Sequence, residues 1–201
     1  LPLSRIPASL GGKADSIAAN ALFAAGIAYA LGLPTHAIEQ GLSGFTSDLS
    51  GNPGRHNWIE GFPFELLLHL ADGVEAFADL VATLAAAPPE GLRHLYLTLP
   101  GNRSDDYIRA QARVVAGHFD RYYLTDYQDL RGRNQGEVPQ IVLQELVANG
   151  VPADAISLLS PSPEDLFVAL DQVGNGDRLA VITNYVDDAK SAIDRLRQRL
   201  A

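Results

Sequence analysis

Residues 94–106 of the chain read HLYLTLPGNRSDD, and this stretch decides the fold. The run from His94 to Leu99 is mostly apolar and rich in strand-favouring residues, which is typical of a strand buried on both faces. Pro100 and Gly101 end that run, and Ser104 followed by two aspartates is a helix N-terminus signal. The stretch therefore predicts a strand, a tight turn and a helix that begins at Asp105.

The same strand-then-helix unit recurs from residue 56 to the end of the chain. Strands are predicted at 64–70, 94–99, 122–125, 156–159 and 179–183, and helices at 73–86, 105–118, 137–149, 163–172 and 187–200. This alternation is typical of βαβ units. We therefore expect residues 56–201 to form an α/β domain with a Rossmann-like, mostly parallel sheet and helices on both faces. Residues 56–60 and 62–70 can also pair around Gly61, which would make one edge antiparallel.

Residues 1–55 have no strand pattern and read as helices and a connection. An apolar helix predicted at 14–31 is closed by Gly32 and Pro34, and Thr35 is predicted to cap a short helix at 36–42. One apolar helix is a poor core for an independent domain. We therefore expect residues 1–55 to be the helical tail and linker of a domain that precedes Leu1, and the absence of methionine fits a piece of a longer chain.

Composition excludes several classes of protein. With 24 acidic and 15 basic residues the formal net charge is −9, which argues against general binding to nucleic acid or to anionic membranes. No apolar run reaches the roughly 20 residues of a membrane-spanning helix, and no signal peptide is evident. The chain has no cysteine, so disulfides and thiolate metal sites are excluded. We expect a cytoplasmic protein.

Ligands of open α/β sheets bind at the carboxyl ends of the strands, so the loops there hold the candidate site residues. After the strand at 94–99, Arg103 can meet a carboxylate or a phosphate. The alternative is a plain turn with a helix cap. Arg55 in the turn at 52–55 is a weaker candidate, since a surface arginine beside a glycine is common.

The loop at 126–133, DYQDLRGR, is long and charged for a simple connection. Arg131 and Arg133 flank a glycine and can form a fork for an anionic group, while Asp126 and Asp129 can orient them or bind a cationic substrate. The alternative is a solvated loop whose opposite charges pair internally.

Two other site types find no support in the sequence. The five histidines lack the spacing of metal ligands, and no GxxxxGK[ST] phosphate loop is present. We therefore predict no metal site in these residues and no nucleotide hydrolysis by this chain alone.

Several blocks of sequence resemble the Mur ligase superfamily, and most of all the cyanophycin synthetases. The first block is Ile6-Pro7-Ala8-Ser9-Leu10-Gly11-Gly12-Lys13 with Ala18-Ala19-Asn20-Ala21-Leu22. The others, in the family's order, are 41–45, 52–55, 100–105 and 129–133 with Gly136-Glu137. Together they span most of the chain, and the block at 129–133 is the most specific to cyanophycin synthetases.

The resemblance implies the C-terminal portion of an ATP-dependent amide ligase that works through an acyl phosphate. It implies ATP and Mg²⁺ as cofactors, bound jointly with the preceding central ATPase domain, and an amino acid or peptide polymer as substrate. On this basis Asn20 faces the adenine and Arg55 the phosphates, and Arg103, Arg131 and Arg133 lie on loops that face the cleft. By analogy with the family we also expect a homo-oligomer.

The chain departs from the family at the expected nucleotide site. Where the family has DYAHNP, this sequence has His69-Leu70-Ala71-Asp72-Gly73-Val74, so His69 stands in place of the ribose-binding aspartate. Asp72 brings a negative charge to the same region. Both changes are expected to weaken ATP binding. The alternative function is therefore a catalytically degenerate structural or interaction module of a larger synthetase.

Overall fold

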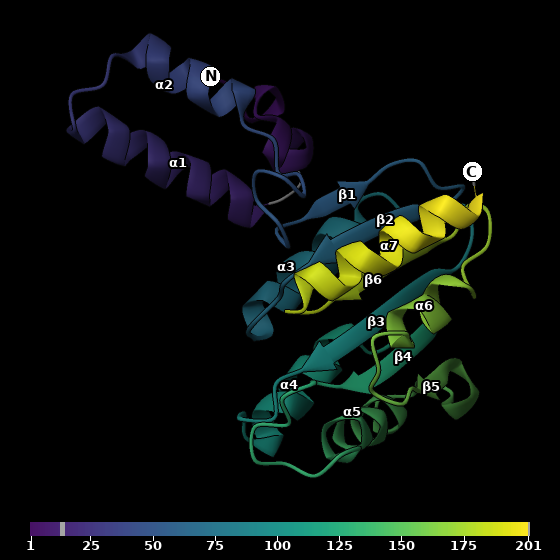
Figure 1. The fold of residues 1–201 in the computed structure, drawn as a ribbon. Coiled ribbons are helices and arrows are strands. Elements are labelled where there is room, and N and C mark those ends of the chain that lie inside the picture. Colours follow the sequence, from purple (N-terminus) through teal and green to yellow (C-terminus); the bar gives the residue numbers. More distant parts are fainter. Residues whose placement is uncertain (13–14, 201) are drawn as a thin grey trace.

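The computed structural model describes residues 1–12 and 15–200, and within them the strands form one six-stranded sheet (Figure 1). Its order is β1-β2-β6-β3-β4-β5. The strands are β1 (Asn57–Ile59), β2 (Glu65–His69), β3 (Arg93–Leu99), β4 (Arg121–Asp126), β5 (Ile156–Leu158) and β6 (Arg178–Ile182). All neighbours pair parallel except β1 and β2, which form a hairpin through Gly61. The predicted fold class and its antiparallel edge are confirmed.

Helices cover both faces of this sheet. On one face lie α3 (Val74–Ala85), α4 (Asp105–Val115) and α5 (Glu137–Ala148), and on the other lie α6 (Asp165–Leu170) and α7 (Val186–Leu200). The strands alternate between the two cores: Leu67 packs with the first group of helices, while Leu66 and Leu68 pack with the second. Because all three are buried, β2 reads as a continuous apolar run, which is the pattern that identified it.

The predicted helix at 105–118 ends earlier, at Val115. The reason is Tyr122, whose hydroxyl donates to the Val115 carbonyl (2.9 Å) and accepts from the Gly117 N–H (3.0 Å). Gly117 has a positive φ, which takes the chain out of the helix and into β4. A short 3₁₀ helix, η3 (Ala153–Ala155), precedes β5.

Residues before β1 form a separate helical arm. It comprises the 3₁₀ helices η1 (Leu3–Arg5) and η2 (Pro7–Gly12) and the helices α1 (Asp15–Ala30) and α2 (Thr35–Gly44). We call these four elements the arm. Helices α1 and α2 form a hairpin that projects from the α/β domain (Figure 1). Lys13 and Ala14, where the sequence predicts the start of α1, lie outside the described residues.

One detail of the arm was predicted wrongly. Thr35 is the first residue of α2 and does not cap it; the N-cap is Pro34, which makes no side-chain cap bond. The carbonyl oxygen of Pro34 accepts from the N–H groups of Ala37 and Ile38, so the backbone alone starts this helix.

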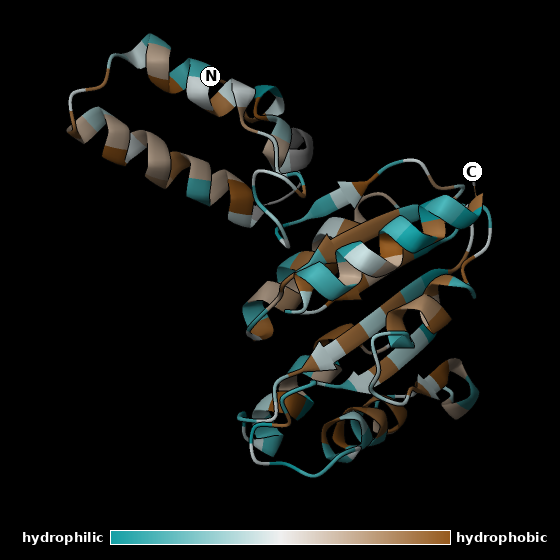
Figure 2. Ribbon diagram, viewed as in Figure 1, coloured by the Kyte–Doolittle hydropathy of each residue, from teal (hydrophilic) through white to brown (hydrophobic). Residues whose placement is uncertain are grey.

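Apolar residues occur around α1, whereas the outward side of α7 is largely hydrophilic (Figure 2).

Candidate functional site

A large cavity lies between the arm and the first βα unit of the α/β domain. Its volume is about 1010 Å³, ample for a ligand of nucleotide size. The arm contributes mainly apolar side chains, among them Ile17, Ala21 and Leu42, with Ser16 and Asn20 as polar groups. The α/β domain and the linker before it contribute mainly polar and charged residues: Arg55, His56, His69, Asp72, Glu75 and Asp79.

All four residues predicted to bind the cofactor line this cavity. Asn20 comes from α1, Arg55 from the linker before β1, His69 from the end of β2 and Asp72 from the loop that follows. Asn20 and Asp72 are 52 positions apart in the sequence, and the folding back of the arm brings all four residues to one cavity. The contacts of each with a ligand stay predictions.

The local backbone around Arg55 is fixed by hydrogen bonds. Gly54 donates its N–H to Asn57 Oδ1 (2.6 Å), and its carbonyl oxygen accepts from the Leu70 N–H (2.7 Å). Its φ of 76° suits glycine, and a Cβ there would meet Val186 at 3.0 Å. Arg55 then reaches the Leu70 carbonyl oxygen through Nη1 (3.2 Å). The turn that the sequence left as a default surface feature is therefore tied to the end of β2.

His69 is buried against a second histidine that the sequence did not single out. The backbone N–H of His56 donates to His69 Nδ1 (3.2 Å), and the two ring centroids are 3.9 Å apart. Burial is the main cause that lowers the pKa of His69 to about 3, and the nearby His56 and Arg55 lower it further. His69 is thus neutral, and because Nδ1 accepts, its proton is on Nε2. It offers a neutral donor where the resemblance expects a carboxylate.

Asp79 on α3 is a further residue that the sequence missed. Its Oδ2 accepts from the Ser16 hydroxyl of α1 (2.7 Å), which links the arm to the domain. The same oxygen is 3.9 Å from His56 Nε2, a buried nitrogen without a hydrogen-bond partner. No sequence motif marks Asp79, because charged residues are common on amphipathic helices such as α3.

The residues predicted to bind substrate lie on the loops after β3 and β4. Arg103 pairs with Asp72 (2.8 Å), which joins this group to the cavity. Arg131 stacks on Tyr127, at 4.8 Å from the ring centroid, and lies 3.7 Å from Asp129. The internal pairing that the sequence left open as an alternative for this loop is therefore present. Arg131 also has a positive φ of 49°, an uncommon conformation for a side chain other than glycine.

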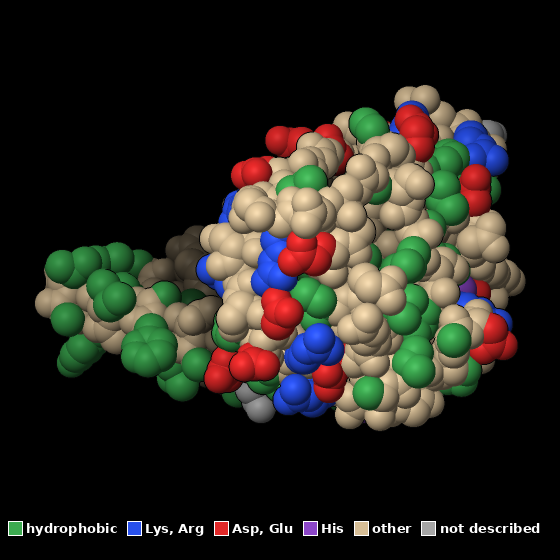
Figure 3. Space-filling model, turned by 90° about the horizontal axis from the view of Figure 1, so that it is seen from below, with side chains coloured by type: hydrophobic (Ala, Val, Ile, Leu, Met, Phe, Trp, Pro, Cys, Tyr) green, Lys and Arg blue, Asp and Glu red, His purple; other side chains and the backbone are tan. Residues whose placement is uncertain are grey.

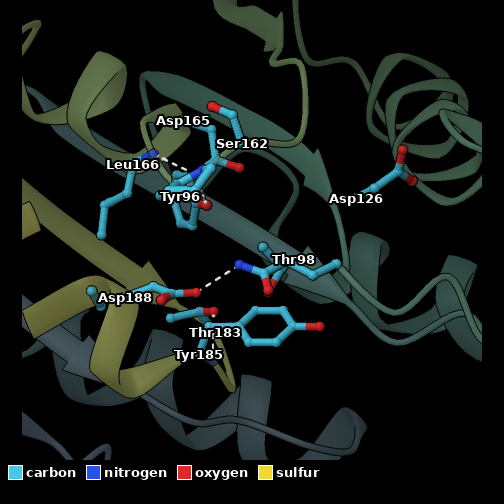
Figure 4. A pocket seen from close by; sticks show the side chains of 12 residues that line it. Tyr96, Thr98, Asp126, Ser162, Asp165, Leu166, Thr183, Tyr185 and Asp188 are labelled. Carbon is cyan, nitrogen blue, oxygen red and sulfur yellow. Dashed lines mark hydrogen bonds between the residues drawn. The ribbon is translucent and has the colours of Figure 1, made fainter. Parts of the chain in front are cut away.

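Asp126 is buried at the end of β4, away from the large cavity. It accepts from the Gly136 N–H at the start of α5 (2.5 Å), and burial raises the pKa of its carboxyl group. Asp126 also borders a small polar pocket of about 20 Å³, room for a single water molecule (Figure 4). The same pocket is bordered by Asp165, which accepts from the hydroxyls of Tyr96 (2.8 Å) and Thr125 (2.9 Å).

Known proteins resemble the chain over nearly its whole length. Cyanophycin synthetase of Crocosphaera subtropica is 28% identical over 193 residues, which are 94% of this chain and 21% of that protein. Cyanophycin synthetase of Synechocystis sp. is 28% identical over 197 residues, 96% of this chain and 22% of that protein. The chain thus spans about a fifth of the length of the curated relatives it matches. No family model matches it.

Solved Mur ligase structures share the fold. UDP-N-acetylmuramate-alanine ligase MurC from Thermotoga maritima has a TM-score of 0.64 and 14% identity, over 90% of this chain and 37% of that chain. E. coli FolC in complex with ADP has a TM-score of 0.60 and 14% identity, over 84% and 36%. The resemblance to Mur ligases and the Rossmann-like fold that the sequence predicts are confirmed.

Proposed function

We propose that the chain is the C-terminal part of an ATP-dependent amide ligase of the cyanophycin synthetase type. In this proposal it closes over ATP and the incoming amino acid together with a preceding domain, in the cytoplasm. The observation that carries the proposal is the cavity, which gathers Asn20, Arg55, His69 and Asp72 at one place. The similarity to cyanophycin synthetases over 94% of the chain supports the reaction class.

The apolar and the charged sides of the cavity suit the base and the phosphates of a nucleotide, respectively. The apolar side chains of the arm can cover a base, with Asn20 as its polar contact, while Arg55 provides a cation for phosphates. Asp72 is partly neutralised by Arg103, so it opposes an anionic ligand less than its charge alone suggests. ATP, when bound, would supply the phosphoryl group that activates a carboxylate. The loops after β3 and β4, which carry Arg103, Asp126, Asp129, Arg131 and Arg133, are the proposed surroundings of the amino acid or peptide substrate.

The described residues hold no group of three or more His, Asp or Glu side chains that could bind a metal ion. We propose that the Mg²⁺ ligands, like the phosphate loop, come from the preceding central domain. The arm supports such a partner, because α1 is apolar on all sides and leaves Phe23 72% and Tyr29 72% exposed. Hydrophobic side chains gather on the projecting end of the molecule (Figure 3). A helix of this kind is normally buried.

In this scheme residues 1–55 are the tail of the central domain with its linker, and residues 56–201 are the C-terminal domain. A homo-oligomer is proposed by analogy alone. No helix among the residues that the structure describes is long and apolar enough to cross a membrane.

The alternative is a degenerate module whose nucleotide site no longer works. The neutral, buried His69 favours it, because a neutral imidazole is a poorer partner for ribose hydroxyls than a carboxylate. One experiment separates the two: ATP affinity of the full-length protein, measured by calorimetry for the wild type and Arg55→Ala. Binding of ordinary strength that Arg55→Ala abolishes supports the ligase and excludes the degenerate site. Absent binding supports the module, and tight binding by the 201-residue chain alone would contradict a site shared between two domains.

A further inference from the structure

The guanidinium group of Arg133 is almost entirely occupied by acceptors of the protein itself. Nε donates to the Gly101 carbonyl oxygen (3.0 Å) and Nη2 to the Arg103 carbonyl oxygen (2.7 Å). Nη1 lies 2.7 Å from both Asp105 Oδ1 and Glu137 Oε1. A guanidinium has five N–H donors, and four acceptors already face this one. With its side chain only 15% exposed, Arg133 has little left to offer to a ligand.

Gly101 provides the space that this arrangement needs. A Cβ at this position would lie 2.9 Å from Arg133 Cγ and 2.3 Å from the Leu130 carbonyl oxygen. Both are closer than a Cβ tolerates, and the second is backbone that cannot turn aside. The loop after β3 and the loop after β4 therefore fit together only with glycine at residue 101 and arginine filling the gap beside it.

The contact continues from Arg133 to the cavity. Arg133 holds the backbone carbonyl of Arg103, and the side chain of Arg103 in turn pairs through Nη2 with Asp72, which lines the cavity. Arg103 Nε is buried without a hydrogen-bond partner, so the position of the Arg103 side chain depends on the loop that carries it. Arg133 itself does not line the cavity.

We propose that Arg133 is a positioning residue, which fixes the loop at 100–104 so that Arg103 stands against Asp72 at the rim of the cavity. The dependence runs in one direction, from Arg133 through Arg103 to Asp72. This proposal rests on the proposed function only in taking the cavity as the ligand site. In this role Arg133 acts through Arg103 and needs no contact of its own with a substrate.

The test uses side-chain NMR of the full 201-residue chain labelled with ¹⁵N-arginine, without any ligand. The readout is the rate at which two groups exchange with water: the Arg103 Nη2–H that donates to Asp72, and the Arg133 Nε–H that donates to the Gly101 carbonyl oxygen. Arg133→Lys keeps the charge but cannot reach four acceptors, so the bond from Arg103 Nη2–H to Asp72 is expected to open more often, and this group should exchange about tenfold faster, the factor for one charge-assisted hydrogen bond. Gly101→Ala forces the two loops apart and is expected to have the same effect by an independent route.

The matched control is Arg113→Lys, which alters an arginine–carboxylate pair between α4 and α5 that has no contact with these loops. It should leave Arg103 unchanged. Asp72→Asn tests the direction: it should free Arg103 while Arg133 Nε–H stays protected by the Gly101 carbonyl.

The proposal is overturned if Arg103 is unaffected in both Arg133→Lys and Gly101→Ala. It is equally overturned if the Arg113 control has the same effect, or if Asp72→Asn frees Arg133 as well. Since no ligand is involved, a failure of ATP to bind would count against the proposed function and not against this one.

Discussion

Replacing Asp177 by Asn removes one of two acceptor oxygens from the centre of a buried polar network. Asp177 Oδ1 accepts from the Leu92 N–H (2.7 Å), and Oδ2 accepts from the Gly174 N–H (2.7 Å) and from His94 Nε2 (3.1 Å). His94 Nδ1 in turn lies 3.2 Å from the Tyr123 hydroxyl. The network joins β3, β4 and the turn before β6.

The magnitude follows from counting donors. An asparagine has one acceptor oxygen, so its amide NH₂ must face either the Leu92 or the Gly174 N–H. One buried donor left without an acceptor, together with weaker neutral bonds for the others, amounts to about 2–4 kcal/mol of the free energy of unfolding. In a chain of this length that corresponds to a fall in Tm of roughly 5–15 °C.

The loss should also depend on pH. Burial by itself raises the pKa of Asp177, but the Gly174 and Leu92 N–H groups and His94 outweigh it and hold the pKa below its ordinary value. A depressed pKa contributes stability that is complete above the unfolded pKa of about 4 and is lost as pH falls through the folded value. The difference between wild type and Asp177→Asn is therefore largest near pH 7 and shrinks below about pH 4.

Urea denaturation at pH 7 and at pH 3, followed by circular dichroism, measures this difference. Asp187→Asn is the control, since the Asp187 side chain is 99% exposed and should change the free energy of unfolding by less than about 0.5 kcal/mol. An Asp177→Asn variant as stable as this control, or a difference from wild type that is the same at both pH values, would refute the reasoning.

Three further variants test the core and the arm. Tyr122→Phe removes the hydroxyl that donates to the Val115 carbonyl and accepts from the Gly117 N–H. It should lower the free energy of unfolding, measured by urea titration, by about 2–4 kcal/mol. A change below about 0.5 kcal/mol would contradict the structural role given to this hydroxyl. Phe23→Ala on the arm should leave the stability of this chain within about 0.5 kcal/mol of wild type, because Phe23 is 72% exposed. Phe77→Ala on α3, at a fully buried position, should remove about 3–5 kcal/mol, and equal effects of the two phenylalanine variants would contradict the assignment of the core.

Much of the fold could be predicted because its signals are local. Leu66, Leu67 and Leu68 form an unbroken apolar run because β2 is buried on both faces, and such runs alternating with helices indicate a parallel sheet. Ser104 does accept the Tyr107 N–H and starts α4, as its position in the sequence indicates. Where the prediction was wrong, at Thr35, a backbone carbonyl supplied the cap, and no side chain marks that choice.

The candidate site was less accessible to sequence. Asn20 and Arg55 were chosen from a resemblance alone, and only the folding of the arm against β2 and α3 places them in one cavity. His56 and Asp79 escaped notice because nothing near them in the chain forms a motif with them. Their roles come from His69 and Ser16, which are 13 and 63 residues away.

The sequence by itself determined the class of the fold, the family it resembles and the loops that carry the candidate ligand-binding groups, since hydrophobic periodicity and short motifs are properties of neighbouring residues. Only the tertiary structure decided which contacts those groups make. Arg131 and Arg133 look alike in the sequence, yet Arg133 is enclosed by acceptors that include two carbonyl oxygens about 30 residues away. Backbone acceptors of this kind carry no mark in the sequence, because every residue has a carbonyl and only the packing of the loops brings two of them to one guanidinium.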